Sequence, residues 1–334
     1  MTNLRSPLGL TKEQIDTFQE DGFLVVDSVL NDDDLAPLEQ EYASLLDDIA
    51  DEMVEAGHIP DAFNTLPFGE RYSTIIALYP ALHYRFNISL PLINGPVDPS
   101  MYHVHSGPAV FGLQRNPKIL DVVESILGPE IWSSPVQQMR MKPPVKRVAA
   151  GLAGHSNVGA TTWHQDIVAL LPEADDTQVV TVWVAVTDAT IENGCLVSVP
   201  GSHREGPKVH CSNMELASEP HVPGKLMENR EARPLPVKRG GIILFHKMNI
   251  HRALPNTSNA LRWSVDLRYN PIGQPSGRPA FPGFVARSRA NPASELTDAQ
   301  VWADNWEKAR QVIVSGGWHD RVFEDTRWND AAAC

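Results

Sequence analysis

A succession of short β-prone runs between residues 131 and 269 constrains the fold of this chain more than any other feature. The runs are separated by Gly, Pro, Asn and Asp, and no helical segments alternate with them. Short strands of this kind are typical of an antiparallel sandwich or barrel and argue against a βαβ fold. The sequence therefore predicts a mainly β core, whose clearest strands are expected at 179–186, 195–199, 241–245 and 261–267.

Helical patterns precede this β region. Thr11 and Gln14 form a capping box before a short apolar stripe that ends at Gly22, and residues 23–26 read as a buried strand. In the acidic segment that follows, apolar residues recur at helical spacing while the carboxylates face elsewhere, as on the solvated side of a helix. That apolar stripe comprises Leu35, Leu38, Tyr42, Leu45, Leu46 and Ile49.

Two further helices are expected. One has Asn116 as its cap, Pro117 at its first position and Gly128 as its stop. The other lies near the end of the chain, where Thr297 and Gln300 resemble a capping box. The apolar stripes of these helices contain Ile119, Leu120, Val123, Ile126 and Leu127 in the first, and Trp302, Trp306 and Ala309 in the second.

These patterns favour a single domain over residues 1–334, without internal repeats or low-complexity linkers. Its expected parts are a helical N-terminal region at about 10–130, a β core at about 131–275 and a helical extension at about 276–334. Segments 56–106 and 207–236 are irregular, so either could cover a substrate, although plain packing explains them equally well.

Composition excludes several functions. A net charge of -13 without a Lys/Arg-rich stripe opposes nucleic-acid binding. No apolar run approaches the ~18 residues of a membrane helix, and the first residues lack the apolar region of a signal peptide. The three cysteines are too few and too scattered for a disulfide framework or a thiolate zinc site, which fits a reducing cytosol. A cytoplasmic protein that acts on small molecules is expected, and a homodimer is compatible with these features.

The motif Trp163-His164-Gln165-Asp166 indicates a metal site. On a strand, residues i and i+2 face the same way, so His164 and Asp166 can converge on one ion. Joined by a distant histidine, such a pair composes the facial triad of non-haem Fe(II) oxygenases, which leaves coordination positions open. A His-x-Asp pair alone is weak evidence. The candidate third ligand is His251, which follows a predicted strand and precedes a Pro-Asn turn.

Arg262, on the next predicted strand, adds a separate indication. Its planar guanidinium suits a carboxylate, and its place in an apolar strand calls for an anionic partner. The alternative is a structural ion pair with Asp266 or Glu192. The remaining candidate ligands, His103, His105, His155 and His246, lack a carboxylate at strand spacing and are not expected to bind metal.

The order of these motifs resembles the phytanoyl-CoA dioxygenase family of Fe(II)/2-oxoglutarate oxygenases over roughly residues 10–275. The resemblance implies a double-stranded β-helix, a cupin-like jelly roll with packed helices. It also implies that His164, Asp166 and His251 bind iron and that Arg262 holds the distal carboxylate of 2-oxoglutarate. The matching motifs also include Asp21-Gly22-Phe23, Trp183 to Asp188, Glu192-Asn193-Gly194-Cys195-Leu196 and Pro200-Gly201-Ser202-His203.

By the same resemblance, Trp183 and Gln137 line the cosubstrate or substrate pocket, and Lys142 is a weaker candidate. The implied reaction oxidises a small organic metabolite with O2 and 2-oxoglutarate and releases succinate and CO2. Asp166 favours oxygenation over halogenation, because related halogenases have a small residue there. Hydroxylation is the expected outcome, with desaturation, ring formation and endoperoxidation left open. No phosphate-binding loop points to a coenzyme A thioester, so a secondary metabolite or an amino-acid-like substrate is expected.

Two alternatives come from other classes of protein. A cupin-like metal enzyme that does not use 2-oxoglutarate would give Arg262 no role. A non-catalytic β-sandwich binding protein would retain the ligands without turnover.

Overall fold

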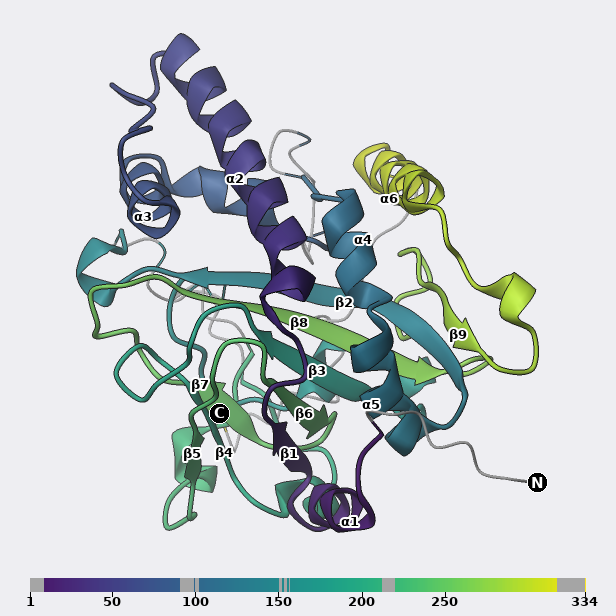
Figure 1. The fold of residues 1–334 in the computed structure, drawn as a ribbon. Coiled ribbons are helices and arrows are strands. Elements are labelled where there is room, and N and C mark those ends of the chain that lie inside the picture. The colour runs from purple at the N-terminus through teal and green to yellow at the C-terminus, as the bar shows by residue number, and fades with distance from the viewer. Residues whose placement is uncertain are drawn as a thin grey trace.

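Two antiparallel β-sheets form the centre of the molecule (Figure 1). The computed structural model describes residues 9–90, 99, 102–149, 152, 155, 157–211, 220–316 and 334. The prediction of a mainly β core is confirmed. The six-stranded sheet has, in spatial order, β1 (Phe23–Val26), β6 (Ile242–His246), β3 (Val180–Ala185), β8 (Arg262–Pro271), β2 (Glu130–Lys142) and β9 (Phe284–Ser288). The three-stranded sheet has β5 (Arg233–Leu235), β4 (Leu196–Ser198) and β7 (His251–Ala253).

Strand β8 shows how the six-stranded sheet divides its two faces. Its residues are buried from Arg262 to Asn270, so both faces are covered. Alternate residues face opposite ways along a strand. The apolar set joins the core beneath the helices, and the other set points between the two sheets. The outer set is Trp263, Val265, Leu267 and Tyr269, and the inner set is Arg262, Ser264, Asp266, Arg268 and Asn270.

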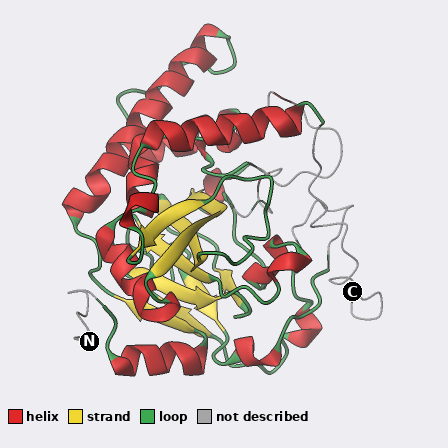
Figure 2. Ribbon diagram, turned by 90° about the vertical axis from the view of Figure 1, so that its right-hand side faces the viewer, coloured by secondary structure: helices red, strands yellow, loops and turns green. Residues whose placement is uncertain are grey.

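Helices cover the outer face of this sheet, and Figure 2 shows the longer ones gathered on one side of the strands. Their apolar stripes pack on outward-facing residues of β3, β6 and β8, which gives one continuous core. A second apolar cluster lies between the sheets and includes Trp183, Leu196 and Phe245. The α-helices are α1 (Lys12–Asp21), α2 (Asp32–Glu55), α3 (Phe68–Leu78), α4 (Pro108–Gln114), α5 (Pro117–Leu127) and α6 (Ala299–Val314).

The predicted caps of the early helices are confirmed. Thr11 and Gln14 form the capping box of α1, and Gly22 ends that helix with a left-handed φ of 78°. Asn116 accepts a hydrogen bond from the backbone of Lys118 at the start of α5. A glycine takes a positive φ without the steric cost that a side chain would add, which explains why α1 stops at Gly22.

Two details differ from the sequence predictions. Helix α6 is capped by Asp298, not Thr297, because the Asp298 side chain accepts from the backbone N–H of Gln300. Segment 56–106, which shows no clear pattern in the sequence, contains α3 and the 3-10 helix η1 (Pro80–Phe86). Parts of both candidate lids, residues 91–98, 100–101 and 212–219, lie outside the described residues.

Short 3-10 helices complete the connections. Among the described residues, no helix combines the length and apolarity that crossing a membrane requires. Beyond η1, the 3-10 helices are η3 (Val145–Arg147), η5 (Asp166–Ala169), η6 (Pro172–Ala174), η7 (Ser202–Glu205), η9 (Gly224–Leu226) and η10 (Pro292–Ser294).

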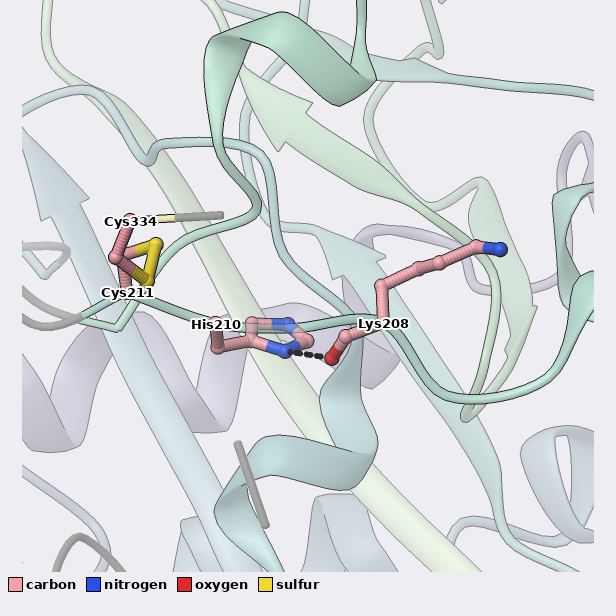
Figure 3. The surroundings of a disulfide bond; sticks show 4 residues. All are labelled: Lys208, His210, Cys211 and Cys334. Atoms are coloured by element: carbon pink, nitrogen blue, oxygen red, sulfur yellow. Dashed lines mark hydrogen bonds between the residues drawn. A yellow bond between two sulfur atoms is a disulfide. The ribbon is translucent and has the colours of Figure 1, made fainter. Parts of the chain in front are cut away.

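A disulfide joins Cys211 to Cys334, with Cα atoms 5.5 Å apart and a sequence separation of 123 (Figure 3). The sequence did not indicate this bond, because a cysteine count carries no information about which distant residues the fold brings together. Cys195 is buried and free.

Candidate metal centre

The three predicted ligands lie together although they come from separate segments. One ligand atom each from His164, Asp166 and His251 lies within 4.8 Å of the other two, and no other such group of His, Cys, Asp or Glu occurs among the described residues. The backbones of His164 and His251 form an isolated antiparallel bridge with two N–H···O bonds of 3.0 Å. This bridge, not sequence proximity, brings the two imidazoles to one place.

The local structure around Asp166 departs from the predicted strand. His164 belongs only to the bridge with His251, and Asp166 begins the 3-10 helix η5. The Nε2 atom of His164 still lies 4.0 Å from Oδ1 of Asp166. The i and i+2 side chains therefore converge as expected, but a bridge followed by a tight turn produces the convergence.

Both imidazoles are oriented by their backbone contacts. Nδ1 of His164 lies 2.8 Å from the carbonyl oxygen of Thr162, and Nδ1 of His251 lies 3.0 Å from that of Asn249. A carbonyl only accepts hydrogen bonds, so each Nδ1 must carry the proton and each Nε2 keeps its lone pair. Phe245 stacks on His251 with the ring planes 16° apart. A histidine whose other ring nitrogen donates to a backbone carbonyl is held in the orientation that suits metal ligation.

The charge states also suit a cation. Burial, followed by the neighbouring His251, lowers the pKa of His164, so its imidazole is neutral at pH 7. Burial alone would raise the pKa of Asp166, but the charge of Arg268, with smaller contributions from the two nearby histidines, outweighs this effect and lowers it. Two imidazoles and one carboxylate form a donor set for a divalent transition metal, with positions left open for other ligands.

Arg262 is the second predicted site residue. Its side chain is completely buried, and Nη1 donates to Oγ of Ser264 at 2.7 Å. Its Nε and Nη2 atoms have no hydrogen-bond partner among the residues that the structure describes. Burial lowers its pKa to about 10, which leaves it charged at pH 7. A buried guanidinium with unused donors is costly, so its surroundings call for an anion.

The alternative of a structural ion pair for Arg262 is not realised. Asp266 pairs instead with Nε of Arg140 at 2.6 Å, and neither Asp266 nor Glu192 forms an ion pair with Arg262. The guanidinium carbon of Arg262 lies 5.4 Å from the ring centroid of Trp183, within the range of a cation–π contact.

A small cavity of about 20 Å³ lies beside the three ligands. Trp183 and Lys142, both predicted from the sequence, line it together with Arg140 and Thr181. Arg140 and Thr181 were not predicted from the sequence. Strand alternation was the available signal for Arg140, because it lies two residues before Lys142 on β2 and therefore on the same face.

Gln137 does not line this cavity. It lies in the irregular part of β2, where the pairing with β8 shifts register between Ser134 and Gln138. Its side-chain nitrogen donates to Oε1 of Gln114 at 2.9 Å and to the carbonyl of Ser134 at 2.8 Å. Gln137 lies three positions before Arg140, so strand alternation already places it on the opposite face of the sheet, where it joins a buried polar cluster with Gln114 of α4.

The other histidines have structural partners. Nε2 of His105 lies 2.9 Å from a Glu41 carboxylate oxygen, and Nδ1 of His246 accepts from the backbone of Met248. His155 and His83 share a contact of 3.0 Å between their Nε2 atoms. Among the described residues, none of these four histidines belongs to the ligand group.

Segment 56–106 reaches the cavity through a chain of polar contacts. The side-chain nitrogen of Asn157 donates to Oδ1 of Asn87 at 2.8 Å, and Nη1 of Arg140 lies 3.4 Å from Oδ1 of Asn157. Arg140 in turn lines the cavity. The described part of this segment is therefore linked to the site through Asn157 and Arg140, and none of its residues lines the cavity.

Comparison with known proteins adds an independent line of evidence. A family model described as phytanoyl-CoA dioxygenase matches residues 18–264. "Phytanoyl-CoA dioxygenase domain-containing protein 1" of Rattus norvegicus is 28% identical over 274 residues, covering 76% of this chain and 87% of its own. A homolog of that protein from Caenorhabditis elegans is 25% identical over 266 residues, covering 73% and 85%.

Solved structures share the fold. The non-heme monooxygenase ThoJ superposes with a TM-score of 0.51 at 19% identity, covering 91% of this chain and 99% of its own. The epimerase SnoN in complex with Fe3+, alpha ketoglutarate and nogalamycin RO gives a TM-score of 0.50 at 18% identity, covering 80% and 86%. The predicted jelly roll with packed helices is confirmed.

Proposed function

The chain belongs to the phytanoyl-CoA dioxygenase family of Fe(II)- and 2-oxoglutarate-dependent oxygenases, and from that membership we propose that it oxidises a small organic metabolite and releases succinate and CO2. The proposal assigns His164, Asp166 and His251 as iron ligands and Arg262 as the anchor of 2-oxoglutarate. The observation that carries it is the convergence of three ligand atoms within 4.8 Å, with both Nε2 lone pairs free.

The residues fit both groups. Two oriented imidazoles and an ionised carboxylate suit Fe(II), which would supply the oxygen-activating redox chemistry when bound. The unused Nε and Nη2 donors of Arg262 suit the distal carboxylate of 2-oxoglutarate. Trp183, beneath the guanidinium, and Lys142, on the cavity wall, are proposed to border the cosubstrate. Gln137 is assigned at most an indirect role, through its contact with Gln114.

The protein's part in this reaction is to hold the reactants and limit water. Phe245 and Leu196 form apolar walls beside polar groups in the cavity. Arg262 would hold one end of the cosubstrate, and the three ligand residues would hold the metal, so that the reactants are oriented relative to each other. The small cavity is consistent with a site that admits little solvent.

Hydroxylation is the proposed outcome. Asp166 occupies a ligand position and leaves no place for a metal-bound halide, which argues against halogenation. Desaturation, ring formation and endoperoxidation use the same machinery and remain alternatives. The substrate is proposed to be a small secondary metabolite or an amino-acid-like molecule, and the cytoplasmic location and a homodimer are likewise proposals.

The test is an aerobic incubation of the purified protein with Fe(II), 2-oxoglutarate and candidate substrates, in which succinate is measured. Succinate formation should depend on substrate and fall by at least about 100-fold in Arg262→Ala, because a bidentate carboxylate contact is removed from a desolvated site. Metal affinity should be unchanged in that variant. Arg287→Ala is the matched control, since Arg287 is a buried arginine that pairs with Asp121 and Glu124.

Two results would favour the alternatives. Full turnover without 2-oxoglutarate, unaffected by Arg262→Ala, would identify a cupin-like metal enzyme of another type. Metal binding without any succinate, across a broad set of substrates, would identify a non-catalytic binding protein.

A further inference from the structure

The carboxylate of Asp166 is held by two residues that sequence analysis did not select. Nη2 of Arg268 donates to Oδ1 at 2.5 Å, and Oγ1 of Thr181 donates to Oδ2 at 2.6 Å. All three side chains are almost completely buried, each with 3% exposure. Both carboxylate oxygens are therefore engaged before any ion is considered.

Neighbouring strands place these two donors side by side. Thr181 on β3 and Arg268 on β8 are direct partners in the antiparallel register. Nη1 of Arg268 also donates to the carbonyl of Val136 at 2.9 Å, which holds the guanidinium at two points. The planar fork of arginine has little freedom once two of its nitrogens are bound, so its direction toward Asp166 is fixed.

The direction of approach matters. Asp166 and Thr181 line the cavity beside the histidines, whereas Arg268 is not among its lining residues. The guanidinium thus reaches Oδ1, the oxygen that also lies 4.0 Å from Nε2 of His164, from a residue outside the cavity lining. Such a contact can persist when a metal binds.

We propose that Arg268 and Thr181 are positioning residues that hold Asp166 as a metal ligand and together form an anion-binding cradle beside it. This inference rests on the proposed iron-binding function. A free carboxylate can rotate and bind a metal through one oxygen or two. A carboxylate bonded at both oxygens presents one orientation, and partners of this kind usually account for 10- to 100-fold in metal affinity.

The first experiment measures metal binding without turnover. The metal-free protein is titrated calorimetrically with Co(II), an air-stable ion that takes the same ligand types as Fe(II). Arg268→Lys and Thr181→Val should each weaken binding about 10- to 100-fold. Arg287→Lys and Thr177→Val are the matched controls and should bind Co(II) as the wild type does. Arg287 forms a buried ion pair with Asp121, and the buried hydroxyl of Thr177 donates to the carbonyl of Pro275, so neither residue contacts Asp166.

The outcomes separate this inference from the proposed function. A wild-type protein that binds no Co(II) or Fe(II) refutes the proposed function. Wild-type binding with unchanged affinity in folded Arg268→Lys and Thr181→Val refutes only the positioning role.

A second experiment tests the cradle even if Arg268 variants fold poorly. In Asp166→Ala, the Arg268 guanidinium and the Thr181 hydroxyl face the vacated position. Added formate should enter it, be held by these donors and restore Co(II) affinity by at least about 10-fold. No recovery with formate in a folded Asp166→Ala protein would overturn the cradle. In Asp166→Ala/Arg268→Gln, formate should have no effect, and full recovery there would exclude Arg268 as its holder.

Discussion

Backbone carbonyls determine the chemistry available to the two triad histidines. Because Thr162 and Asn249 each accept from an Nδ1–H, both rings are held as the tautomer that offers Nε2 to a metal. The acceptor in each case lies two residues before the histidine, so the local backbone and not a distant side chain sets the tautomer. Arg262 contributes the complementary feature, a buried cation with unused donors.

Four other histidines are buried or half-buried and should make stability depend on pH. Burial is the largest cause that lowers the pKa of His83, His155, His210 and His246, in each case to about 4 from an ordinary 6.5. Between these values the unfolded chain binds protons that the folded protein does not. The free energy of unfolding should therefore fall as pH decreases from 6.5 toward 4, by up to about 1.4 kcal/mol per pH unit for each histidine.

Urea unfolding at several pH values between 7 and 5 measures this slope, in a range above most carboxylate titrations. A variant such as His83→Asn should show a shallower slope than the wild type. Equal slopes in the two proteins would mean that His83 titrates alike in the folded and unfolded states.

At the scale of elements, α6 lies near the end of the described chain yet belongs to the main core. Trp302 and Trp306 are at most 1% exposed, and their rings contact Phe111 of α4 and Phe281, at centroid distances of 5.6 and 5.7 Å. Figure 1 shows α6 beside α4. Helix α6 therefore packs against α4 in the main core, and the single-domain organisation stays a prediction.

Trp306→Ala tests whether α6 is part of one cooperative unit. Removal of this buried side chain should lower the free energy of unfolding by about 3–5 kcal/mol, through lost burial and a cavity. Val312→Ala, on the same helix at 49% exposure, should change it by less than about 0.5 kcal/mol. Denaturant unfolding followed by circular dichroism measures both. A separate early transition for α6, with an unchanged main transition, would contradict the single-domain prediction.

At the scale of the whole molecule, the Cys211–Cys334 disulfide links the last residue to the surroundings of the metal centre. His210 is next to Cys211, and its Nδ1 is hydrogen-bonded to the carbonyl oxygen of Lys208 (Figure 3). Its Nε2 accepts a hydrogen bond from the backbone N–H of Gln165, which lies between the predicted iron ligands His164 and Asp166. The backbone of Val222 also donates to the carbonyl of Trp163. The disulfide-bonded loop therefore supports the His164–Asp166 segment.

Loss of this disulfide should destabilise the protein. A cross-link between residues 123 positions apart strongly restricts the unfolded chain, so Cys334→Ser should lower the free energy of unfolding by about 2–4 kcal/mol. Thermal unfolding with and without dithiothreitol measures the effect. Cys195→Ala is the control, because Cys195 is free and that variant should keep its sensitivity to reductant. A wild-type melting temperature unaffected by reductant would show that the bond contributes nothing to stability.

Disulfides persist mainly in oxidising compartments, so the redox state of this pair in cells also tests the proposed cytoplasmic location.

The sequence by itself determined the features that depend on local pattern. Capping residues at Thr11 and Asn116, the apolar stripe of α2, and the strands at β3, β6 and β8 follow from spacing along the chain, which geometry converts directly into faces and ends. The motifs also sufficed to select His164, Asp166, His251 and Arg262, because their residue types and order match one family.

Only the tertiary structure decided the features that depend on contacts between distant segments. Register pairs Thr181 with Arg268 beside Asp166, and the fold brings Cys211 to Cys334. Neither feature has a local signal, because each depends on which strand or loop lies opposite in space. Sequence pattern fixes which face a side chain occupies, whereas long-range pairing fixes what it meets there.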